Sequence, residues 1–167
     1  MKKNMELAKI YYESPVGLLE LSGTDNSLES LLFVDKERGD KTAGNAYLER
    51  CVTQLDEYFS GSRKVFTINL DPDGTDFQKS VWAELVKIPF GVTTSYLQLS
   101  ETLGDVKAIR AVANANKRNR IAIIIPCHRV IGSDGSLVGY AGGLWRKKWL
   151  LEHEQSFISG EKQLDLF

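Results

Sequence analysis

The first seventy residues combine short apolar runs with turn-forming residues, a pattern typical of antiparallel strands. Candidate strands run over residues 6–12, 18–21 and 28–34, separated by turns rich in Gly, Pro and Asn. Apolar positions between 46 and 59 recur at helical spacing, and Gly61 follows as a stop signal. Residues 64–70 alternate apolar and polar, which predicts a further strand. This part of the chain is therefore expected to be β-rich with one helix.

A turn-rich segment, residues 71–74, separates this part from one in which helical patterns dominate. We place a domain boundary there, with an N-terminal β-rich domain over residues 1–74 and a second domain over 75–167. The fold class that this order of elements predicts is α+β.

Two Thr/Ser-x-x-Gln segments, at 75–78 and 95–98, fit the capping box that opens a helix. They predict helices to about residue 88 and to residue 103, and Asp105 can cap another from about 106 to 116. The last two helices resemble a helix-turn-helix, but an ordinary corner between two helices explains the same spacing equally well.

The aliphatic run 121–125 reads as a buried strand that leads directly into Pro126 and Cys127. His128 and Arg129 follow, and a thiol beside an imidazole or a cation has a lowered pKa and so becomes a nucleophile. The alternative, a buried cysteine acting as a small apolar residue, is favoured for a cysteine in a random context. The neighbours of Cys127 reverse that preference.

The net charge of −1 on 167 residues argues at first against a partner made of nucleic acid. The charge is uneven, however: residues 1–75 carry 9 basic and 13 acidic side chains, whereas residues 76–167 carry 12 basic and 9 acidic ones. The stretch 107–133 holds no acidic residue, so its cations can replace the counterions of a phosphate backbone. These cations are Lys107, Arg110, Lys117, Arg118, Arg120 and Arg129.

The sequence argues against a structural metal site, a disulfide and a membrane-spanning segment. With 2 Cys and 2 His, and no CxxC or HxxxH pair, we expect no structural metal and two free thiols in a reducing compartment. The longest aliphatic run, 121–125, is far shorter than the ~20 residues of a membrane span. The N-terminus lacks the apolar run of a signal peptide.

Several blocks of the second part together resemble the O6-alkylguanine-DNA alkyltransferases, the methylated-DNA–protein-cysteine methyltransferases. The strongest block is Pro-Cys-His-Arg-Val-Ile at 126–131, followed by Tyr-Ala-Gly-Gly at 140–143 and Leu-Leu-Glu-His-Glu at 150–154. Upstream, 77–82, 88–91, 94–96 and 110–116 match in order and spacing. The resemblance covers about residues 75–156 strongly, and the first 70 residues match only in type.

The resemblance implies a ribonuclease-H-like N-terminal domain and a winged-helix-like C-terminal domain that contains the helix-turn-helix. It also implies single-use repair of double-stranded DNA: a flipped O6-methylguanine gives its methyl group to Cys127, with O4-methylthymine as a second candidate substrate. No cofactor or metal takes part, and the protein is expected to be a monomer in the cytoplasm, or in the nucleus of a eukaryotic host.

The same resemblance assigns a role to each site residue. His128 takes the thiol proton, Glu154 orients His128, and Glu152 is left as a solvent charge. Asn119 ties the active-site turn in place, and Tyr96 serves guanine N3. The remaining residues contact DNA or the base: Arg110 fills the gap left by the flipped base, Tyr140 walls the base, the Ala141 N–H faces O6, and the Cys127 and Val130 carbonyls accept from the exocyclic amine.

This chain departs from the family pattern in two places. Arg120 follows Asn119 where proline is usual, which puts the stiffness of that turn in doubt and adds a cation for DNA. Ala141 stands where many members have serine, with little loss expected, because the contact is made by the backbone.

Two other functions compete with repair. A non-catalytic binder of damaged DNA, of the alkyltransferase-like kind, lacks the acceptor cysteine, so Cys127 argues against it. A cysteine hydrolase usually draws its nucleophile and base from distant segments, and Cys127 and His128 are adjacent.

Overall fold

The computed structural model describes residues 7–39 and 43–164. They form two compact units. One contains Met1–Asp73 together with Arg120–Ala122, and the other contains Gly74–Asn119 and Ile123–Phe167. Residues 120–122 thus belong to the first unit, although they lie beyond the single boundary that we place at residue 74. Within the described residues, no helix has both the length and the apolar composition needed to cross a bilayer.

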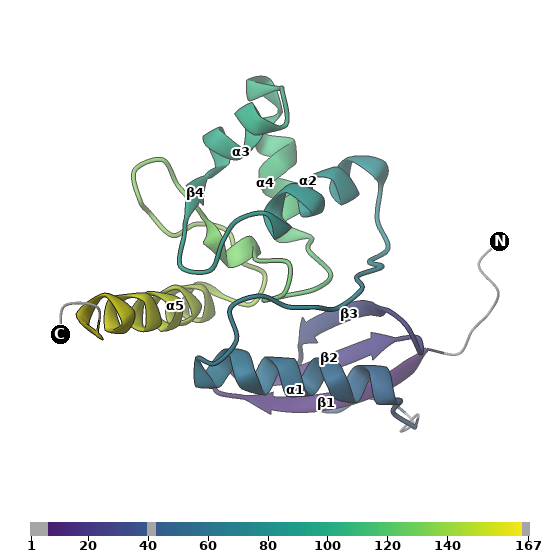
Figure 1. The fold of residues 1–167 in the computed structure, drawn as a ribbon. Coiled ribbons are helices and arrows are strands. Elements are labelled where there is room, and N and C mark those ends of the chain that lie inside the picture. The colour runs from purple at the N-terminus through teal and green to yellow at the C-terminus, as the bar shows by residue number, and fades with distance from the viewer. Residues whose placement is uncertain (1–6, 40–42, 165–167) are drawn as a thin grey trace. The chain divides into compact units, whose positions relative to one another are not determined.

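The first unit is a small antiparallel sheet packed against one helix (Figure 1). The strands are β1 (Ala8–Ser14), β2 (Gly17–Gly23) and β3 (Leu28–Phe33), in the order β1-β2-β3. Helix α1 (Ala46–Ser60) begins at an Asn45 cap and ends at Gly61, whose φ of 88° suits a residue without Cβ. The core of the unit is aliphatic and includes Leu19, Leu21, Leu31, Leu48 and Leu55.

The predicted strand over 64–70 is wrong, apart from a single bridge between Leu28 and Leu70. A side chain takes the place of a strand ladder here. The Gln54 amide accepts from the Thr67 N–H at 2.9 Å and donates to the Thr67 hydroxyl at 2.9 Å. The buried Gln54 amide thus satisfies the Thr67 N–H, while the Asn69 carbonyl and the Asp71 N–H bond the backbone of Leu28 at 2.9 Å each.

The predicted strand over 121–125 is also wrong, although its burial was predicted correctly. Only Ile121 pairs, in a bridge to Leu31. The Leu31 N–H donates to the Arg120 carbonyl at 2.9 Å, and the Leu31 carbonyl accepts the Ala122 N–H at 2.9 Å. The chain then turns at Ile123, which is 1% exposed and has a φ of 70°. A β-branched residue rarely adopts this conformation, so the turn before the cysteine is strained.

The second unit is built of helices with one short parallel strand pair. Its helices are α2 (Asp76–Val86), α3 (Tyr96–Thr102), α4 (Ile109–Lys117) and α5 (Leu144–Leu164), with a 3₁₀ turn, η1 (Val106–Ala108), before α4. Both predicted capping boxes are present at the starts of α2 and α3. Asp105 caps η1 rather than an α-helix, so the third predicted helix starts three residues late. The α3–η1–α4 segment is the helix-turn-helix, and the chain as a whole is α+β.

Helix α5 buries a different face from the one that its apolar residues suggest. Leu144 and Trp145 are 48% and 57% exposed. The buried positions are instead Lys147, Leu150 and Glu154, which share one face at helical spacing. Two ionisable side chains of α5, Lys147 and Glu154, are therefore buried.

Candidate active site

Cys127 opens a tight turn, η2 (Cys127–Arg129), and its side chain is buried. Pro126 fixes the preceding backbone, and the Cys127 N–H bonds the Ile125 carbonyl at 2.8 Å. The Arg129 N–H closes the turn on the Pro126 carbonyl at 3.0 Å. The nucleophile is thus held by backbone geometry rather than by a flexible loop.

Two asparagines brace this turn. Asn119 donates from its side-chain amide to the Ile125 carbonyl at 2.8 Å. Asn116, which the sequence analysis did not single out, is buried on α4 and donates to the Cys127 carbonyl at 3.4 Å. That carbonyl also accepts the Val130 N–H. The turn is therefore fastened both to the end of α4 and to the residues beyond that helix.

A buried charge cluster lies directly behind the cysteine. The His128 Nε2 contacts one carboxylate oxygen of Glu154, and the Arg129 Nε donates to the other at 2.7 Å. The Gly91 N–H also donates to Glu154, at 3.0 Å, and Arg129 donates to the Ile88 carbonyl at 2.6 Å. His128 and Glu154 are fully buried. By contrast, Glu152 is exposed, with Lys148 at 3.8 Å.

Burial and pairing set the protonation of this cluster. Burial alone would raise the pKa of Glu154, but its bonds and charge pairs with His128 and Arg129 hold that pKa well below its ordinary value. Burial lowers the pKa of His128, despite the opposing pull of Glu154. Since Glu154 is a carboxylate, the His128 Nε2 carries the hydrogen, and Nδ1 has the free lone pair. Within the described part of the chain, this Nδ1 has no hydrogen-bond partner.

The cysteine itself rests as a thiol. Burial raises the pKa of Cys127, while Asn119 and Lys147 counteract part of that shift. The cation expected to help ionise it, Arg129, is engaged with Glu154. A base is therefore needed to produce the thiolate.

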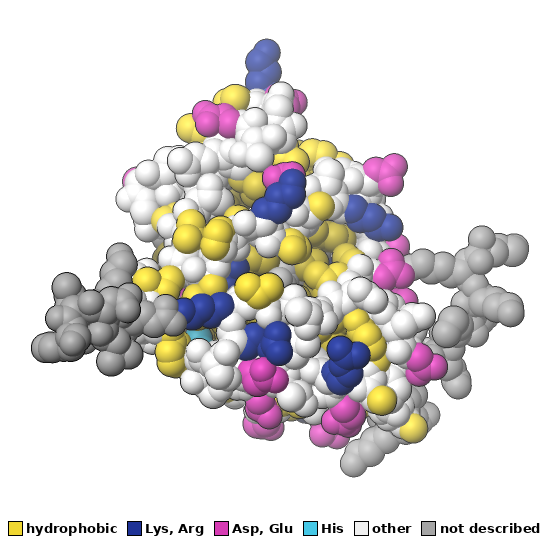
Figure 2. All heavy atoms as spheres, in the orientation of Figure 1, with side chains coloured by type: hydrophobic (Ala, Val, Ile, Leu, Met, Phe, Trp, Pro, Cys, Tyr) yellow, Lys and Arg dark blue, Asp and Glu magenta, His cyan; other side chains and the backbone are white. Residues whose placement is uncertain are grey.

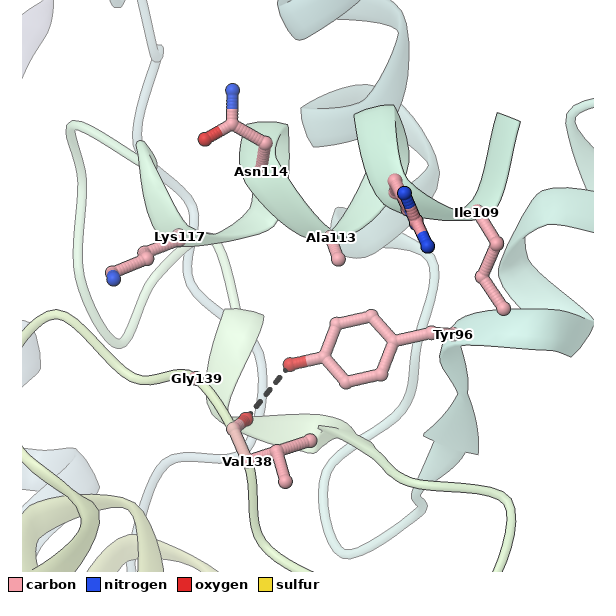
Figure 3. A pocket seen from close by; sticks show the side chains of 8 residues that line it. Tyr96, Ile109, Ala113, Asn114, Lys117, Val138 and Gly139 are labelled. Atoms are coloured by element: carbon pink, nitrogen blue, oxygen red, sulfur yellow. Dashed lines mark hydrogen bonds between the residues drawn. The ribbon is translucent and has the colours of Figure 1, made fainter. Parts of the chain in front are cut away.

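A two-residue parallel pair brings Tyr96 to the site. Strand β4 (Thr94–Ser95) pairs with β5 (Val130–Ile131), with Thr94 opposite Val130. Tyr96 follows β4 directly, and its hydroxyl donates to the Val138 carbonyl at 2.9 Å (Figure 3). Burial, and secondarily the charge of Cys127, raise the pKa of Tyr96. The phenol and the thiol thus belong to one electrostatic site.

An apolar cavity of about 460 Å³ adjoins this site beneath α4 (Figure 3). Tyr96 and Arg110 both line it, and Arg110 is otherwise exposed. Cys127 is not among the lining residues, so Tyr96 connects the cavity with the nucleophile. The full lining is Tyr96, Ile109, Arg110, Ala113, Asn114, Lys117, Val138 and Gly139.

The remaining predicted residues differ in their exposure. Val130 is buried in β5, and Ala141 is exposed in a turn. Tyr140 is buried, and its pKa is raised well above the ordinary value, first by burial and then by the charge of Cys127. Tyr140 therefore lies within the field of the cysteine, while Ala141 faces solvent.

The cations of the acid-free stretch separate into two kinds. Arg129 is 6% exposed and bound to Glu154, so the prediction that it faces phosphate is wrong. Lys107, Arg110, Lys117, Arg118 and Arg120 are exposed. On the face drawn in Figure 2, basic side chains stand as separate spots among acidic and apolar ones.

The described residues contain no group of three or more His, Cys, Asp or Glu side chains suited to a metal ion. Both cysteines are free thiols.

Known proteins match both parts of the chain. Residues 76–156 match the model described as the DNA binding domain of 6-O-methylguanine DNA methyltransferase, and residues 7–72 match the one described as its ribonuclease-like domain. The chain is 45% identical to the methylated-DNA–protein-cysteine methyltransferase of Methanosarcina barkeri, over 88% of this chain and 98% of that protein. The protein of the same name from Mycobacterium leprae is 48% identical, over 86% of this chain and 89% of the relative.

Solved structures agree with the sequence matches. The Mycobacterium tuberculosis protein OGT, in its complex with DNA, has a TM-score of 0.83 and 42% identity, covering 90% of this chain and 94% of that one. Both domain models, at adjoining ranges, and relatives of nearly full length lead to one conclusion. The chain belongs to the 6-O-methylguanine DNA methyltransferase family.

Proposed function

We propose that this protein repairs DNA by moving the methyl group of O6-methylguanine onto Cys127. The observation that carries the proposal is the placement of Cys127 at the start of a braced turn whose next residue, His128, is paired with a buried carboxylate. This is the nucleophile, base and orienting acid of a generalised triad. The names and DNA complex of its relatives support the same reaction.

Removal of the thiol proton is the first step. The neutral His128 accepts the Cys127 proton at Nδ1, through a water molecule. The Glu154 carboxylate then stabilises the imidazolium, because burial strengthens a charge pair of this kind. The low pKa of Glu154 keeps the carboxylate charged throughout.

Transfer is an in-line displacement at the methyl carbon. A bond forms from the Cys127 sulfur to that carbon while the carbon–O6 bond breaks, and its electron pair stays on guanine. The Tyr96 hydroxyl gives its proton to guanine N3, which neutralises the leaving base. The product is a thioether with no nucleophilic charge, so each molecule acts once.

The base reaches this site by leaving the DNA stack. We assign the filling of the gap to Arg110, which is exposed at the cavity. Tyr140 walls the base, the Ala141 N–H meets O6, and the Val130 and Cys127 carbonyls take the exocyclic amine. Since the Cys127 carbonyl already accepts two bonds, the amine replaces the longer one, from Asn116 at 3.4 Å.

Intact mass tests the proposal. After incubation with a duplex containing O6-methylguanine, the protein should gain one CH₂ unit, located on Cys127 and at most one per chain. Cys127→Ala should keep its affinity for DNA and gain no mass. An unmodified wild-type protein that still binds the duplex would show a non-catalytic damage binder instead. The substrate implies a compartment that holds DNA, which is the cytoplasm or a eukaryotic nucleus.

A further inference from the structure

Lys147 is a charged side chain to which the reaction above gives no role. It lies on the inner face of α5 and is fully buried, although a lysine is almost never buried without a partner. No described acidic side chain forms a salt bridge with it. Burial lowers the pKa of Lys147 to about 8, and the negative charge of Cys127 in its thiolate form partly offsets that shift. Such a costly placement calls for a function.

Lys147 closes a triangle of hydrogen bonds with the catalytic phenol. Its Nζ donates to the Val138 carbonyl at 2.8 Å and to the Tyr96 oxygen at 3.4 Å. The Tyr96 hydroxyl donates to the same carbonyl at 2.9 Å. The ammonium also lies 5.6 Å from the centre of the Tyr96 ring, within the range of a cation–π contact.

This arrangement addresses a difficulty in the proposed reaction. The Tyr96 hydrogen is occupied by the Val138 carbonyl and must leave it to reach guanine N3. The Val138 carbonyl is part-buried, and such a carbonyl is penalised when it loses its only donor unless water replaces it. With Lys147 in place, the carbonyl keeps one donor when the phenol turns away.

We propose that Lys147 is the positioning residue of Tyr96, holding the Val138 carbonyl and stabilising the phenol oxygen so that the phenol hydrogen is free for the base. The inference rests on the proposed function. As the sulfur–carbon bond forms, the thiolate charge disappears, and the proton leaving Tyr96 makes a phenolate. Lys147 stays protonated, and after the base departs the phenolate regains a proton from solvent while the His128 imidazolium releases one to solvent. Negative charge thus passes from Cys127 to Tyr96, and Lys147 interacts with both.

A double-mutant cycle tests this role, with single-turnover transfer from an O6-methylguanine duplex as the readout. Lys147→Met should slow transfer about 10- to 100-fold, the size of a lost hydrogen bond from a charged donor. In a Tyr96→Phe background the same change should have almost no further effect. Lys148→Met is the matched control, because the neighbouring Lys148 is exposed, and it should leave the rate unchanged.

The pH profile gives a second readout that a merely structural residue would not move. The groups that face Lys147 are Tyr96 from α3, and Cys127 and His128 from η2. Wild-type transfer should fall as the pH rises above about 8, where Lys147 loses its proton. This falling limb should be absent from Lys147→Met and from Tyr96→Phe.

Three outcomes would overturn the role of Lys147: a Lys147→Met rate equal to that of Lys148→Met, an undiminished effect in the Tyr96→Phe background, or a falling limb that persists in Tyr96→Phe. If Lys147→Met does not fold, the wild-type and Tyr96→Phe profiles decide alone. A wild-type protein that transfers no methyl group refutes the proposed function itself, so the two failures are distinguishable.

Discussion

The turn at Cys127 and the outer face of α4 hold their charges in opposite ways. Behind the turn, Arg129, His128 and Glu154 are buried and bonded to one another. On α4, Arg110 and Lys117 are exposed beside an apolar cavity. A group that moves a proton needs a fixed position and a low dielectric, whereas a group that meets phosphate must reach through solvent. Burial therefore distinguishes the paired charges behind the turn from the exposed cations of α4.

Glu154→Gln should break the buried side of this comparison most severely. The change keeps the shape but leaves the Arg129 cation buried without its partner, which typically costs about 3–5 kcal/mol. His128 also loses the charge that stabilises its imidazolium, so single-turnover transfer should fall by about 10²- to 10⁴-fold. Denaturant unfolding and rapid-quench transfer measure the two effects.

Glu152→Gln is the control for that experiment, since Glu152 lies two residues away and is exposed. It should change the unfolding free energy by no more than about 0.5 kcal/mol and leave the transfer rate as it is. Equal effects of the two substitutions would mean that the buried cluster has no special role.

Acid should weaken the buried cluster in two stages. Because burial lowers the pKa of folded His128, the unfolded chain binds the extra proton, and stability falls as the pH drops below about 6.5. The depressed pKa of Glu154 adds a second loss below about pH 4.5. Unfolding followed against pH should show both losses. In His128→Asn the slope between pH 6.5 and 5 should be smaller, and an unchanged slope would contradict the neutral histidine.

Gly91→Ala tests the close approach of the Gly91 backbone to α5, where the Gly91 N–H donates to Glu154. Gly91 has a φ of 74°, and a Cβ there would lie 1.7 Å from the Ile158 side chain. Gly104 has a φ of 86° but nothing within 4 Å, so Gly104→Ala isolates the backbone strain. Gly91→Ala should be more destabilising than Gly104→Ala by about 1–3 kcal/mol, from overpacking. Thermal or denaturant unfolding of the pair gives the difference.

Arg110→Ala should have the smallest effect on stability, within about 0.5 kcal/mol, because the side chain is exposed. Its effect should appear in DNA binding and in repair, and titrations at several salt concentrations would measure the first. Lys87→Ala, which removes a cation that is 70% exposed at the C-cap of α2, is the control. If Arg110→Ala bound and repaired like the wild type, the assignment of Arg110 to the base gap would be wrong.

Local signals predicted the helices well. Both capping boxes and the Gly61 stop are formed by residues within a few positions of one another, so sequence alone contains the whole interaction. The strands predicted at 64–70 and 121–125 were wrong, because the Gln54 side chain binds the Thr67 N–H in the first segment and the chain turns at Ile123, with a φ of 70°, in the second. Periodicity reports burial and cannot report which group satisfies an amide.

The site shows the same division. The adjacency of Cys127 and His128 is visible in the sequence, whereas the pairing of His128 with Glu154 was expected only through a family resemblance. Lys147 and Asn116 were missed, because a lysine on a helix is usually a solvent charge and an asparagine at a helix end is usually a cap. The signal for Lys147 was its position on the same helical face as Leu150 and Glu154, which apolar patterning alone discounts.

The bond between His128 and Glu154 spans 26 residues of chain. At a synthesis rate of about 5–20 residues per second, a nascent chain contains Cys127 and His128 for about 1–5 s before Glu154 is added. During that interval the histidine has no carboxylate to stabilise its charged form. The carboxylate that pairs with His128 is therefore made last, after the segments that brace the turn at Cys127.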